Sequence, residues 1–502
     1  MGRERTKVAV PATFLNSDGC KTGYVQSPGV RSHWSRLFRG SILAVFLIEA
    51  SCGSATLKQN DGGATGGNGI GGKGAGGAGG EGTGGGSVGG ASGAGQVGGA
   101  GGSAGGGGSA GAAGTGGLAG APGMGGTAGG GGKAGAGGNL GMGGAAGGAA
   151  ASSTVAAHYY FTCATVGGVA WCWGSNGSGR GRGSSLGVGQ DYGLTPYSAV
   201  PLALSSLGAH VEAVSTGADS YHACALVNGG VMCWGDNGTG QLGDGTTSAS
   251  DAPVQVVGIT SGATAVATGD SHSCAIVDGQ VLCWGDNSSG QLGVSGSTVP
   301  LSGTVQAIAL GAFHSCALVG GAVWCWGSNS NGQLGNNSTG AISNVVRVVG
   351  PGSTVQAIAA GGAHTCAIAN GGLFCWGQNN VGQLGDGTTT DRSAPVAVQG
   401  LSTGVQAVAV GSNHTCAVVN GGAWCWGSNG VGQVGNNSMA DQWTPVAVQG
   451  LGTGVQAITA GGGQSCALTS GGSASCWGAN GDGELGDNSM TSSPVPVTVQ
   501  GL

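Results

Sequence analysis

The sequence predicts an all-β fold, a seven-bladed β-propeller, after a Gly-rich N-terminal segment. Three observations lead to this prediction. One string of residues recurs seven times, each copy holds four short stretches of strand character, and each copy carries two Cys around a tight turn. Units of four strands that repeat along a chain are typical of propellers. A helical repeat is excluded, because no segment carries an apolar stripe of period 3.6.

Residues 1–52 predict export of the chain. The apolar run Ser41–Ile48 is short, and Arg residues at positions 31, 36 and 39 precede it. A basic region followed by a brief apolar run is typical of a secretory signal, and the run is too short for a stable membrane-spanning helix. We therefore expect an exported protein, either a lipoprotein of the outer membrane or cell surface or an extracellular protein.

Cys52 is the predicted lipidation site. Two small residues, Ala50 and Ser51, precede it. This arrangement resembles a bacterial lipobox, in which the Cys takes a lipid and becomes the first residue of the mature protein. The sequence departs from that pattern at Glu49, where the lipobox has Leu or a similar residue. Ordinary signal cleavage and an uncleaved anchor are the alternatives. A lipid on Cys52 would be the only contact with a membrane.

Residues 53–152 predict a disordered linker. Gly occupies 49 of these 100 positions, and Ala and Ser fill most of the others. Such a segment cannot bury enough apolar surface to offset the entropy of ordering its backbone. As a flexible chain it has a root-mean-square reach of about 50–60 Å. The folded domain is therefore expected at residues 153–502.

The repeat itself is clearest in the copy that starts at His222. It reads His-Ala-Cys-Ala-Leu, then Asn-Gly-Gly, then Cys-Trp-Gly-Asp-Asn, then Gly-Gln-Leu-Gly. The string recurs from His272, His314, His364 and His414, and a last copy has Gln464 in place of His. A degenerate first copy covers 161–174. In the sixth copy the expected strands are Val405–Val410, Thr415–Val419, Ala423–Trp426 and Pro445–Val448.

The Cys pairs are expected to form disulfides. In six of the seven pairs the Cys lie nine residues apart, and two residues such as Asn-Gly or Gly-Gly stand at the midpoint. These residues suit a type I′ turn, which places the two Cys opposite each other at a non-hydrogen-bonded position. The expected pairs are Cys163 with Cys172, Cys224 with Cys233, Cys274 with Cys283, Cys316 with Cys325, Cys366 with Cys375, Cys416 with Cys425, and Cys466 with Cys476.

Two other interpretations of the Cys remain. Reduced thiols could pack as small apolar groups, or His222, Cys224 and Cys233 could hold a metal from one strand face. An oxidising compartment favours disulfides, and the Cys spacing is unlike that of most metal sites. Each disulfide should add about 2–3 kcal/mol to the free energy of unfolding. We therefore expect no metal and no cofactor. The repeated His and Trp are expected to serve hydrogen bonding and packing between blades.

Two features concern the folded domain as a whole. From residue 153 onward, 15 acidic residues stand against four Arg, a formal charge of −11 (4 − 15), which opposes binding to nucleic acid. The first copy has only weak strand character before Cys163, and the C-terminal segment Pro494–Gln500 has no obvious partner. We expect this last strand to join the first blade and close the ring.

The recurring string resembles the repeat of the regulator of chromosome condensation family, which includes the α-tubulin-suppressor-like proteins. The resemblance covers about residues 154–502 and implies a seven-bladed propeller. This chain departs from the family pattern by carrying a Cys in each of two adjacent strands, which fits an exported bacterial member. The family's name-giving member is a guanine-nucleotide exchange factor. Export and the acidic charge argue against carrying that activity over to this chain.

The expected function is binding and not catalysis. The His residues are repetitive, and no nucleophile with a base or pair of carboxylates stands out, as an enzyme would need. Features that break the repeat are better candidates: Arg180, Arg182, Tyr192 and Tyr197 in the long first interval, and Trp443 in another variable loop. Aromatic and Arg side chains in loops suit recognition of a partner protein, and an ordinary surface insertion is the alternative. Carbohydrate or cell-wall binding is a second possible function, and nucleotide exchange a third.

Overall fold

The computed structural model describes residues 135–136, 154–177, 184–189, 196–217, 220–293, 298–340, 342–351 and 354–502. These residues belong to one unit, Gly120–Leu502. The predicted signal region, Cys52 and almost all of the predicted linker 53–152 lie outside the described residues.

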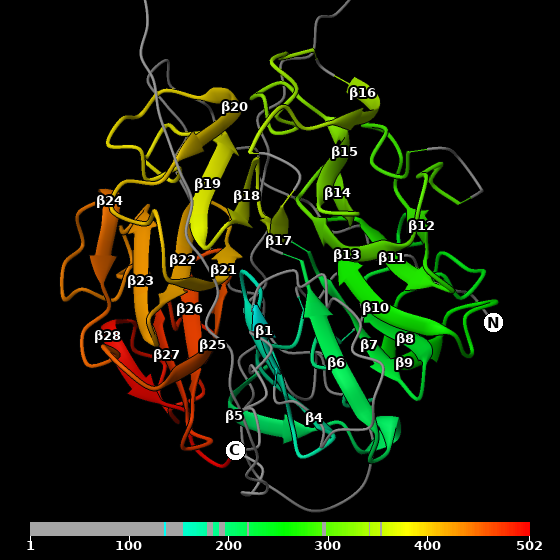
Figure 1. Ribbon diagram of the computed structural model, residues 1–502. Coiled ribbons are helices and arrows are strands. Elements are labelled where there is room, and N and C mark those ends of the chain that lie inside the picture. The colour runs from blue at the N-terminus through cyan, green and yellow to red at the C-terminus, as the bar shows by residue number, and fades with distance from the viewer. Residues whose placement is uncertain are drawn as a thin grey trace, which may run out of the picture. The chain divides into compact units, whose positions relative to one another are not determined.

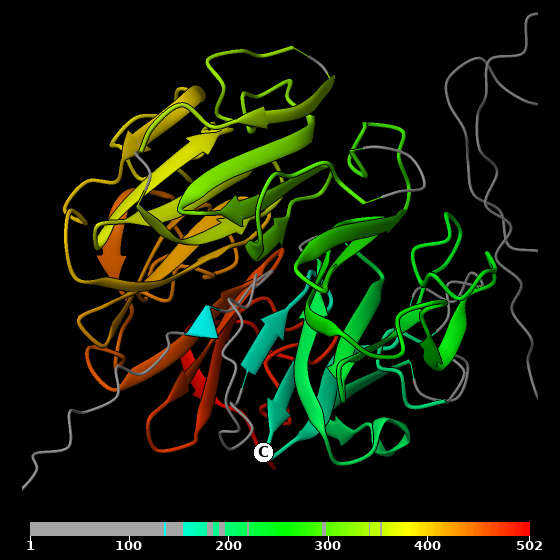
Figure 2. The ribbon, with the colours of Figure 1, turned by 45° about the vertical axis from the view of Figure 1, so that its right-hand side comes forward.

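The described residues form a seven-bladed β-propeller, as predicted (Figures 1 and 2). Blades 1 to 3 comprise β2 (Thr154–Ala157), β3 (Phe161–Val166), β4 (Val169–Ser175) and β5 (Tyr197–Ala203); β6 (Val211–Thr216), β7 (His222–Val227), β8 (Gly230–Gly235) and β9 (Ser250–Gln255); β10 (Ala263–Thr268), β11 (His272–Val277) and β12 (Gln280–Gly285). Blades 4 and 5 comprise β13 (Val305–Leu310), β14 (His314–Val319), β15 (Ala322–Ser328) and β16 (Ile342–Arg347); β17 (Val355–Ala360), β18 (His364–Ala369), β19 (Gly372–Gly377) and β20 (Arg392–Ala397). Blades 6 and 7 comprise β21 (Val405–Val410), β22 (His414–Val419), β23 (Gly422–Gly427) and β24 (Gln442–Ala447); β25 (Val455–Ala460), β26 (Gln464–Thr469), β27 (Ala474–Gly478) and β28 (Ser493–Thr498).

Two short elements complete the description. The two residues of β1 (Gly135–Ala136) pair in parallel with β25, and the 3₁₀ turn η1 (Ser205–Leu207) follows β5. Among the described residues, no helix is long and apolar enough to cross a membrane.

Within a blade, neighbouring strands are antiparallel, and the first strands of successive blades contact one another around the ring. The connections from first to second strand and from third to fourth strand therefore lie at one end of each sheet. We call this end the long-loop face, because it carries the connections such as 236–249. The tight turns between second and third strands lie at the opposite end.

Those tight turns have the residues that their backbone requires. In blade 6, Asn420 and Gly421 have φ values of 51° and 78°, so both central residues are left-handed, as in a type I′ turn. The Gly421 N–H donates to the Gln406 side-chain oxygen at 2.7 Å. Gln406 is the exposed second residue of β21, so the inner strand and the turn hold each other.

The predicted closing strand is wrong. The C-terminal strand β28 pairs with β27 of its own blade, with Val497 opposite Cys476. Blade 1 has four strands of its own, because 154–157 form its first strand β2 and pair with β3. The weak strand character of this segment is offset by burial, since all four residues of β2 are buried.

The ring closes instead through side chains and backbone between blades 7 and 1. The Trp173 Nε1–H and the Thr162 hydroxyl both donate to the Glu484 carbonyl oxygen, at 2.8 and 3.1 Å. The Ala157 N–H donates to the Thr459 hydroxyl oxygen at 3.1 Å. In Figure 2 the first strands of the chain, in cyan, lie beside those of blade 7, in red. Closure therefore needs no exchange of strands.

A ring of glycines joins the blades near the inner strands. A glycine follows the first strand in six blades: Gly217, Gly269, Gly311, Gly361, Gly411 and Gly461. A Cβ on Gly361 would lie 2.0 Å from the Gly411 carbonyl oxygen of the next blade, and a Cβ on Gly411 would lie 2.3 Å from the Gly461 carbonyl oxygen. Backbone N–H groups donate across the same junctions, such as Gly362 to the Gly411 oxygen at 3.2 Å.

We expect Gly361→Ala to lower the free energy of unfolding by about 2–3 kcal/mol, because the new methyl group has to push two blades apart. Gly430→Ala is the matched control, since a Cβ there would meet no atom within 4 Å, and its cost should stay within about 0.5 kcal/mol. Urea unfolding of the two variants measures the difference. Equal stability of both variants would contradict the close approach of the blades.

Candidate functional site

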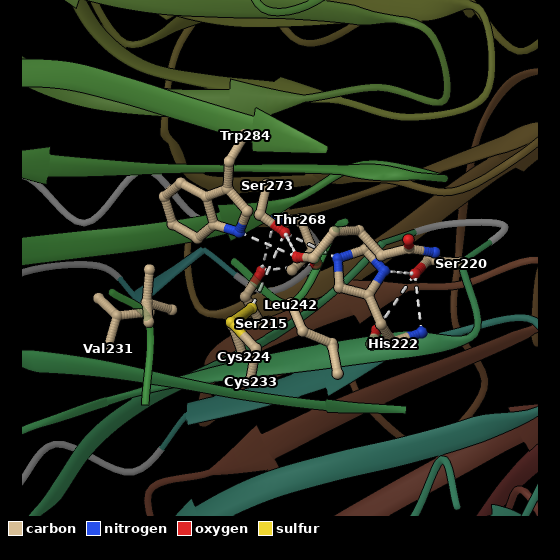
Figure 3. Close-up of a disulfide and its surroundings, with 12 residues drawn as sticks. Ser215, Ser220, His222, Cys224, Val231, Cys233, Leu242, Thr268, Ser273 and Trp284 are labelled. Atoms are coloured by element: carbon tan, nitrogen blue, oxygen red, sulfur yellow. Dashed lines mark hydrogen bonds between the residues drawn. A yellow bond between two sulfur atoms is a disulfide. The ribbon is translucent and has the colours of Figure 1, made fainter. Parts of the chain in front are cut away.

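All seven expected Cys pairs form disulfides, and they are the disulfides found among the described residues. Each joins the second and third strands of one blade: Cys163–Cys172, Cys224–Cys233, Cys274–Cys283, Cys316–Cys325, Cys366–Cys375, Cys416–Cys425 and Cys466–Cys476. The strands place Cys224 directly opposite Cys233, as the turn between them predicts (Figure 3). Among the described residues no group of three metal-ligating side chains is arranged to hold a metal ion.

The repeated His bonds to the next blade. The His222 Nε2 lies 2.8 Å from the Ser273 hydroxyl (Figure 3). That hydroxyl donates to the Gln241 carbonyl oxygen at 3.0 Å. Because the hydroxyl proton goes to that carbonyl, the His Nε2 carries a proton and donates to Ser273. Ser220 bonds to the other ring nitrogen. Equivalent His–Ser or His–Thr pairs start from His272, His314, His364 and His414.

Complete burial keeps these His neutral. Loss of solvation lowers the pKa of His222, His272 and His364 to about 3, and that of His314 and His414 to about 4. In blades 3 to 6, the Nδ1 atom of the repeated His has no hydrogen-bond partner among the described residues. These are His272, His314, His364 and His414. A buried neutral imidazole with one satisfied nitrogen is a structural group here, because it holds adjacent blades and faces no open site.

The repeated Trp completes this junction. The Trp284 Nε1–H donates to the same Gln241 carbonyl oxygen at 2.9 Å, so two groups of blade 3 bind one carbonyl of blade 2. The corresponding Trp of the other blades are fully buried and each donates to the preceding blade: Trp173, Trp234, Trp326, Trp376, Trp426 and Trp477. The Gly-Gln-Leu-Gly string therefore supplies a carbonyl for packing between blades.

Glu484 stands where five of the other copies of this string have Gln. Its side chain is buried, with an exposed fraction of 3%. Burial raises the pKa of its carboxyl to about 7, and the Asp482 N–H donates to it at 2.9 Å. This carboxyl lies where blade 7 meets blade 1. It belongs to no group of metal-ligating side chains among the described residues.

The repeat breaks at the junction of blades 1 and 2. His158 occupies the position of the ring glycines, and Phe161 occupies the position of the repeated His. The His158 ring lies 4.6 Å from the Phe161 ring and 5.9 Å from the Tyr221 ring, between centroids. Side chains thus fill a junction that elsewhere is formed by backbone against backbone.

Three tyrosines gather on the long-loop face at this junction. We call Tyr159, Tyr160 and Tyr221 the aromatic patch. The Tyr159 and Tyr160 rings lie 4.5 Å apart, and the Tyr160 and Tyr221 rings are stacked at 5.5 Å with an interplanar angle of 21°. Tyr159 is 42% exposed, and the other two are half-buried. The equivalent positions of blades 5 to 7 carry only small or polar residues, so the patch is confined to one side of the ring.

Two glycines of blade 7 lie beneath the edge of the patch. A Cβ on Gly462 would lie 1.9 Å from the Tyr159 ring, and a Cβ on Gly463 would lie 3.5 Å from a Val431 methyl group. Val431 is itself 37% exposed. Tyr159 and Val431 therefore cover Gly462 and Gly463 of blade 7, which are both buried.

Of the five predicted partner-binding residues, the structure places two. Tyr197 and Trp443 are 49% and 52% exposed. The expected loop position is wrong for both, because Tyr197 is the first residue of the outer strand β5 and Trp443 is the second residue of the outer strand β24. They belong to blades 1 and 6, and no contact joins them. Arg180, Arg182 and Tyr192 lie outside the described residues.

The aromatic patch was not predicted from the sequence. A signal was available, because the residue before the repeated His changes from copy to copy, and it is Tyr160, Tyr221 and Phe313 in three of them. Only the fold shows that the first two of these meet across a blade junction.

Comparisons with known proteins agree with the architecture. The family model of the RCC1-like domain matches residues 170–502. Human WBSCR16 is similar, with a TM-score of 0.55 and 24% identity, over 61% of this chain and 85% of that chain. A structure of yeast RCC1 with Kap60 has a TM-score of 0.58 and 20% identity, over 66% of this chain and 83% of that chain. Saccharomyces cerevisiae Prp20p has a TM-score of 0.56 and 21% identity, over 66% of this chain and 85% of that chain. No sequence among the curated proteins matches.

Proposed function

Because this chain belongs to the family of RCC1-like domains, we propose that it is a protein-interaction module that binds its partner through the aromatic patch. The observation that carries the proposal is the break in the repeat, which gathers three Tyr on one side of the long-loop face. Tyr is enriched among the residues that dominate binding energy at protein interfaces. The seven disulfides fit an exported protein, and a lipid on Cys52 with the Gly-rich linker would tether the propeller to the envelope.

The proposed role is binding without catalysis or cofactor. The buried His are occupied by the contacts between blades, and the buried Glu484 carboxyl accepts a hydrogen bond from the Asp482 N–H. We do not extend the proposal to nucleotide exchange, because a likeness below 25% identity to yeast RCC1 carries the fold alone.

Affinity capture from an envelope extract with the full chain tests the proposal. We expect the double variant Tyr159→Ala/Tyr221→Ala to capture about tenfold less of a bound protein than the wild type. Truncation of an aromatic anchor weakens the free energy of binding by roughly 2 kcal/mol or more. Val257→Ser is the matched control, since Val257 is 69% exposed and lies beyond the other end of β9. Equal capture by wild type and double variant would overturn the proposal.

Carbohydrate binding is the second candidate, favoured by the stacked pair Tyr160 and Tyr221. Aromatic faces on a surface can stack on sugar rings as they do on other planar or apolar groups. The same capture experiment separates the two candidates. Retention of cell-wall saccharide, lost in the double variant and with no protein bound, would favour this second function.

A further inference from the structure

Blade 3 lacks an outer strand in the part of the chain that the structure describes. Its sheet has the order β10-β11-β12, whereas the other six blades have a fourth strand outside the third. In blade 2, the 12 residues 244–255 lie between Gly243 and Val256. In blade 3, only the five residues 294–298 lie between the equivalent Gly293 and Val299. Five residues are too few for both a loop and a strand of six.

The other blades show what normally occupies this place. Each outer strand sets one apolar residue opposite the second Cys of its blade. The pairs are Cys172 with Leu202, Cys233 with Val254, Cys325 with Val346, Cys375 with Val396, Cys425 with Val446, and Cys476 with Val497. All six apolar residues pack against a blade core. In five of the six strands a Pro directly precedes this residue.

Blade 3 is correspondingly less covered. Cys283 and Trp284 are half-buried, whereas the Cys and Trp at these positions of the other blades are fully buried. Leu292 is 9% exposed, whereas its counterparts Leu242 and Leu334 are 0% exposed. A strand in the usual place would cover this apolar surface.

The backbone edge is also shaped for pairing. The Val299 N–H donates to the Val281 carbonyl oxygen at 3.0 Å, as the Val256 N–H does to Val231 in blade 2. In both blades, the chain that follows the third strand therefore bonds to the beginning of that strand. Beyond that point, Cys233 and Gly235 of blade 2 pair with β9, and their counterparts Cys283 and Gly285 have no strand outside them among the described residues.

We propose that an extended peptide segment of a partner protein adds to the edge of β12 and supplies the missing outer strand of blade 3. The segment carries a Pro-Val or Pro-Leu pair, with the Val or Leu opposite Cys283. This occupant has the chemistry that the outer strands of the other blades have in the same place. Addition of a strand to an open edge is an established mode of peptide recognition. This surface is separate from the aromatic patch and goes beyond the proposed function.

The probe is a synthetic peptide with the sequence of residues 391–400, which includes β20 (Arg392–Ala397). The control is the same peptide with Val396→Asp, because a carboxylate cannot enter the apolar place opposite Cys283. Mild reductant followed by alkylation and mass analysis of the folded full chain reports on each disulfide separately. We expect Cys274–Cys283 to be reduced first, and the probe to slow its reduction about tenfold while the control peptide does not.

A loop-graft variant tests the same edge from within the chain. In it, the segment 294–298 is replaced by the blade 2 sequence of 244–255, which restores an outer strand. This variant should neither bind the probe nor lose its Cys274–Cys283 bond faster than the other six. Reduction of Cys274–Cys283 at the rate of the buried disulfides in the wild type, or binding of both peptides alike, would overturn the proposal.

Two further outcomes are informative. A dimer of the wild type that the loop-graft variant does not form would assign the edge to a second copy of the chain and overturn the partner segment. Failure of the probe leaves the proposed function untouched, since that function is measured on Tyr159 and Tyr221 with a separate readout. The two proposals can therefore fail independently.

Discussion

Acidification should unfold the propeller between about pH 6 and pH 4.5. Disulfides are chemically stable over this range of pH. The cause is the set of five buried His that join the blades. Their pKa values are about 3 to 4 in the fold, against an ordinary value of 6.5. Each is neutral in the folded chain and takes up a proton when the chain unfolds below pH 6.5.

The direction of this pH dependence follows from the number of protons that each state binds. The unfolded state binds more protons than the folded state between pH 6.5 and the folded pKa, so the free energy of unfolding falls as the pH falls through this window. Each His contributes about 1.4 kcal/mol per pH unit, and five together remove roughly 10 kcal/mol by pH 5. Glu484, whose pKa is raised to about 7, works in the opposite direction as a single group. The total is comparable to the whole stability of an ordinary domain.

Far-ultraviolet circular dichroism and Trp fluorescence from pH 8 to pH 4 measure this transition. The natural Gln464 of blade 7 indicates that Gln can occupy the His position, so His414→Gln is the matched variant. We expect this variant to unfold at a lower midpoint pH than the wild type. Between pH 8 and pH 5, its free energy of unfolding should fall by about 2 kcal/mol less than that of the wild type. A wild-type stability that stays constant from pH 7 to pH 5 would contradict the buried neutral state of these His.

Loss of the disulfides should have the second large effect. Each bond closes a loop of about ten residues and contributes about 2–3 kcal/mol in the chain-entropy model. The double substitution Cys416→Ala/Cys425→Ala should therefore lower the free energy of unfolding by about that amount, and reduction of all seven should prevent folding. Both Cys are fully buried, so the deletion also removes packing against Val446.

Intact mass measurements check this second prediction. In denaturant, reduction should add about 14 Da, two hydrogens for each of seven bonds. In native buffer, the buried bonds should persist in mild reductant for as long as the chain stays folded. A chain that is fully reduced in native buffer and keeps its circular dichroism spectrum would show that the bonds do not support the fold.

The blade and its disulfide could be predicted from the sequence because both depend on residues close together in the chain. Asn420 and Gly421 determine the turn, the turn determines the register, and the register brings Cys416 opposite Cys425. Every step depends on residues fewer than ten positions apart. The count of seven blades followed in the same way, from copies of one string.

Features that join distant parts of the chain could not be predicted. The wrong closing strand is one example, since pairing of β28 with β27 or with blade 1 depends on which edge is free in the folded ring. The contact of Tyr160 with Tyr221 is another, because it crosses from blade 1 to blade 2. The missing outer strand of blade 3 was visible only as a short interval of 42 residues between Cys274 and Cys316.

The ring closes without strand exchange, so from β2 to β28 the strands of each blade come from one continuous stretch of chain. New ends can therefore be opened at any segment between blades, and the old ends near Thr154 and Thr498 can be joined, with no strand cut in two. Circular permutants of this kind should retain the same seven disulfides and the same contacts between Trp173 and Glu484. Each blade is therefore a unit that one duplication or deletion of a continuous stretch of sequence would add or remove whole.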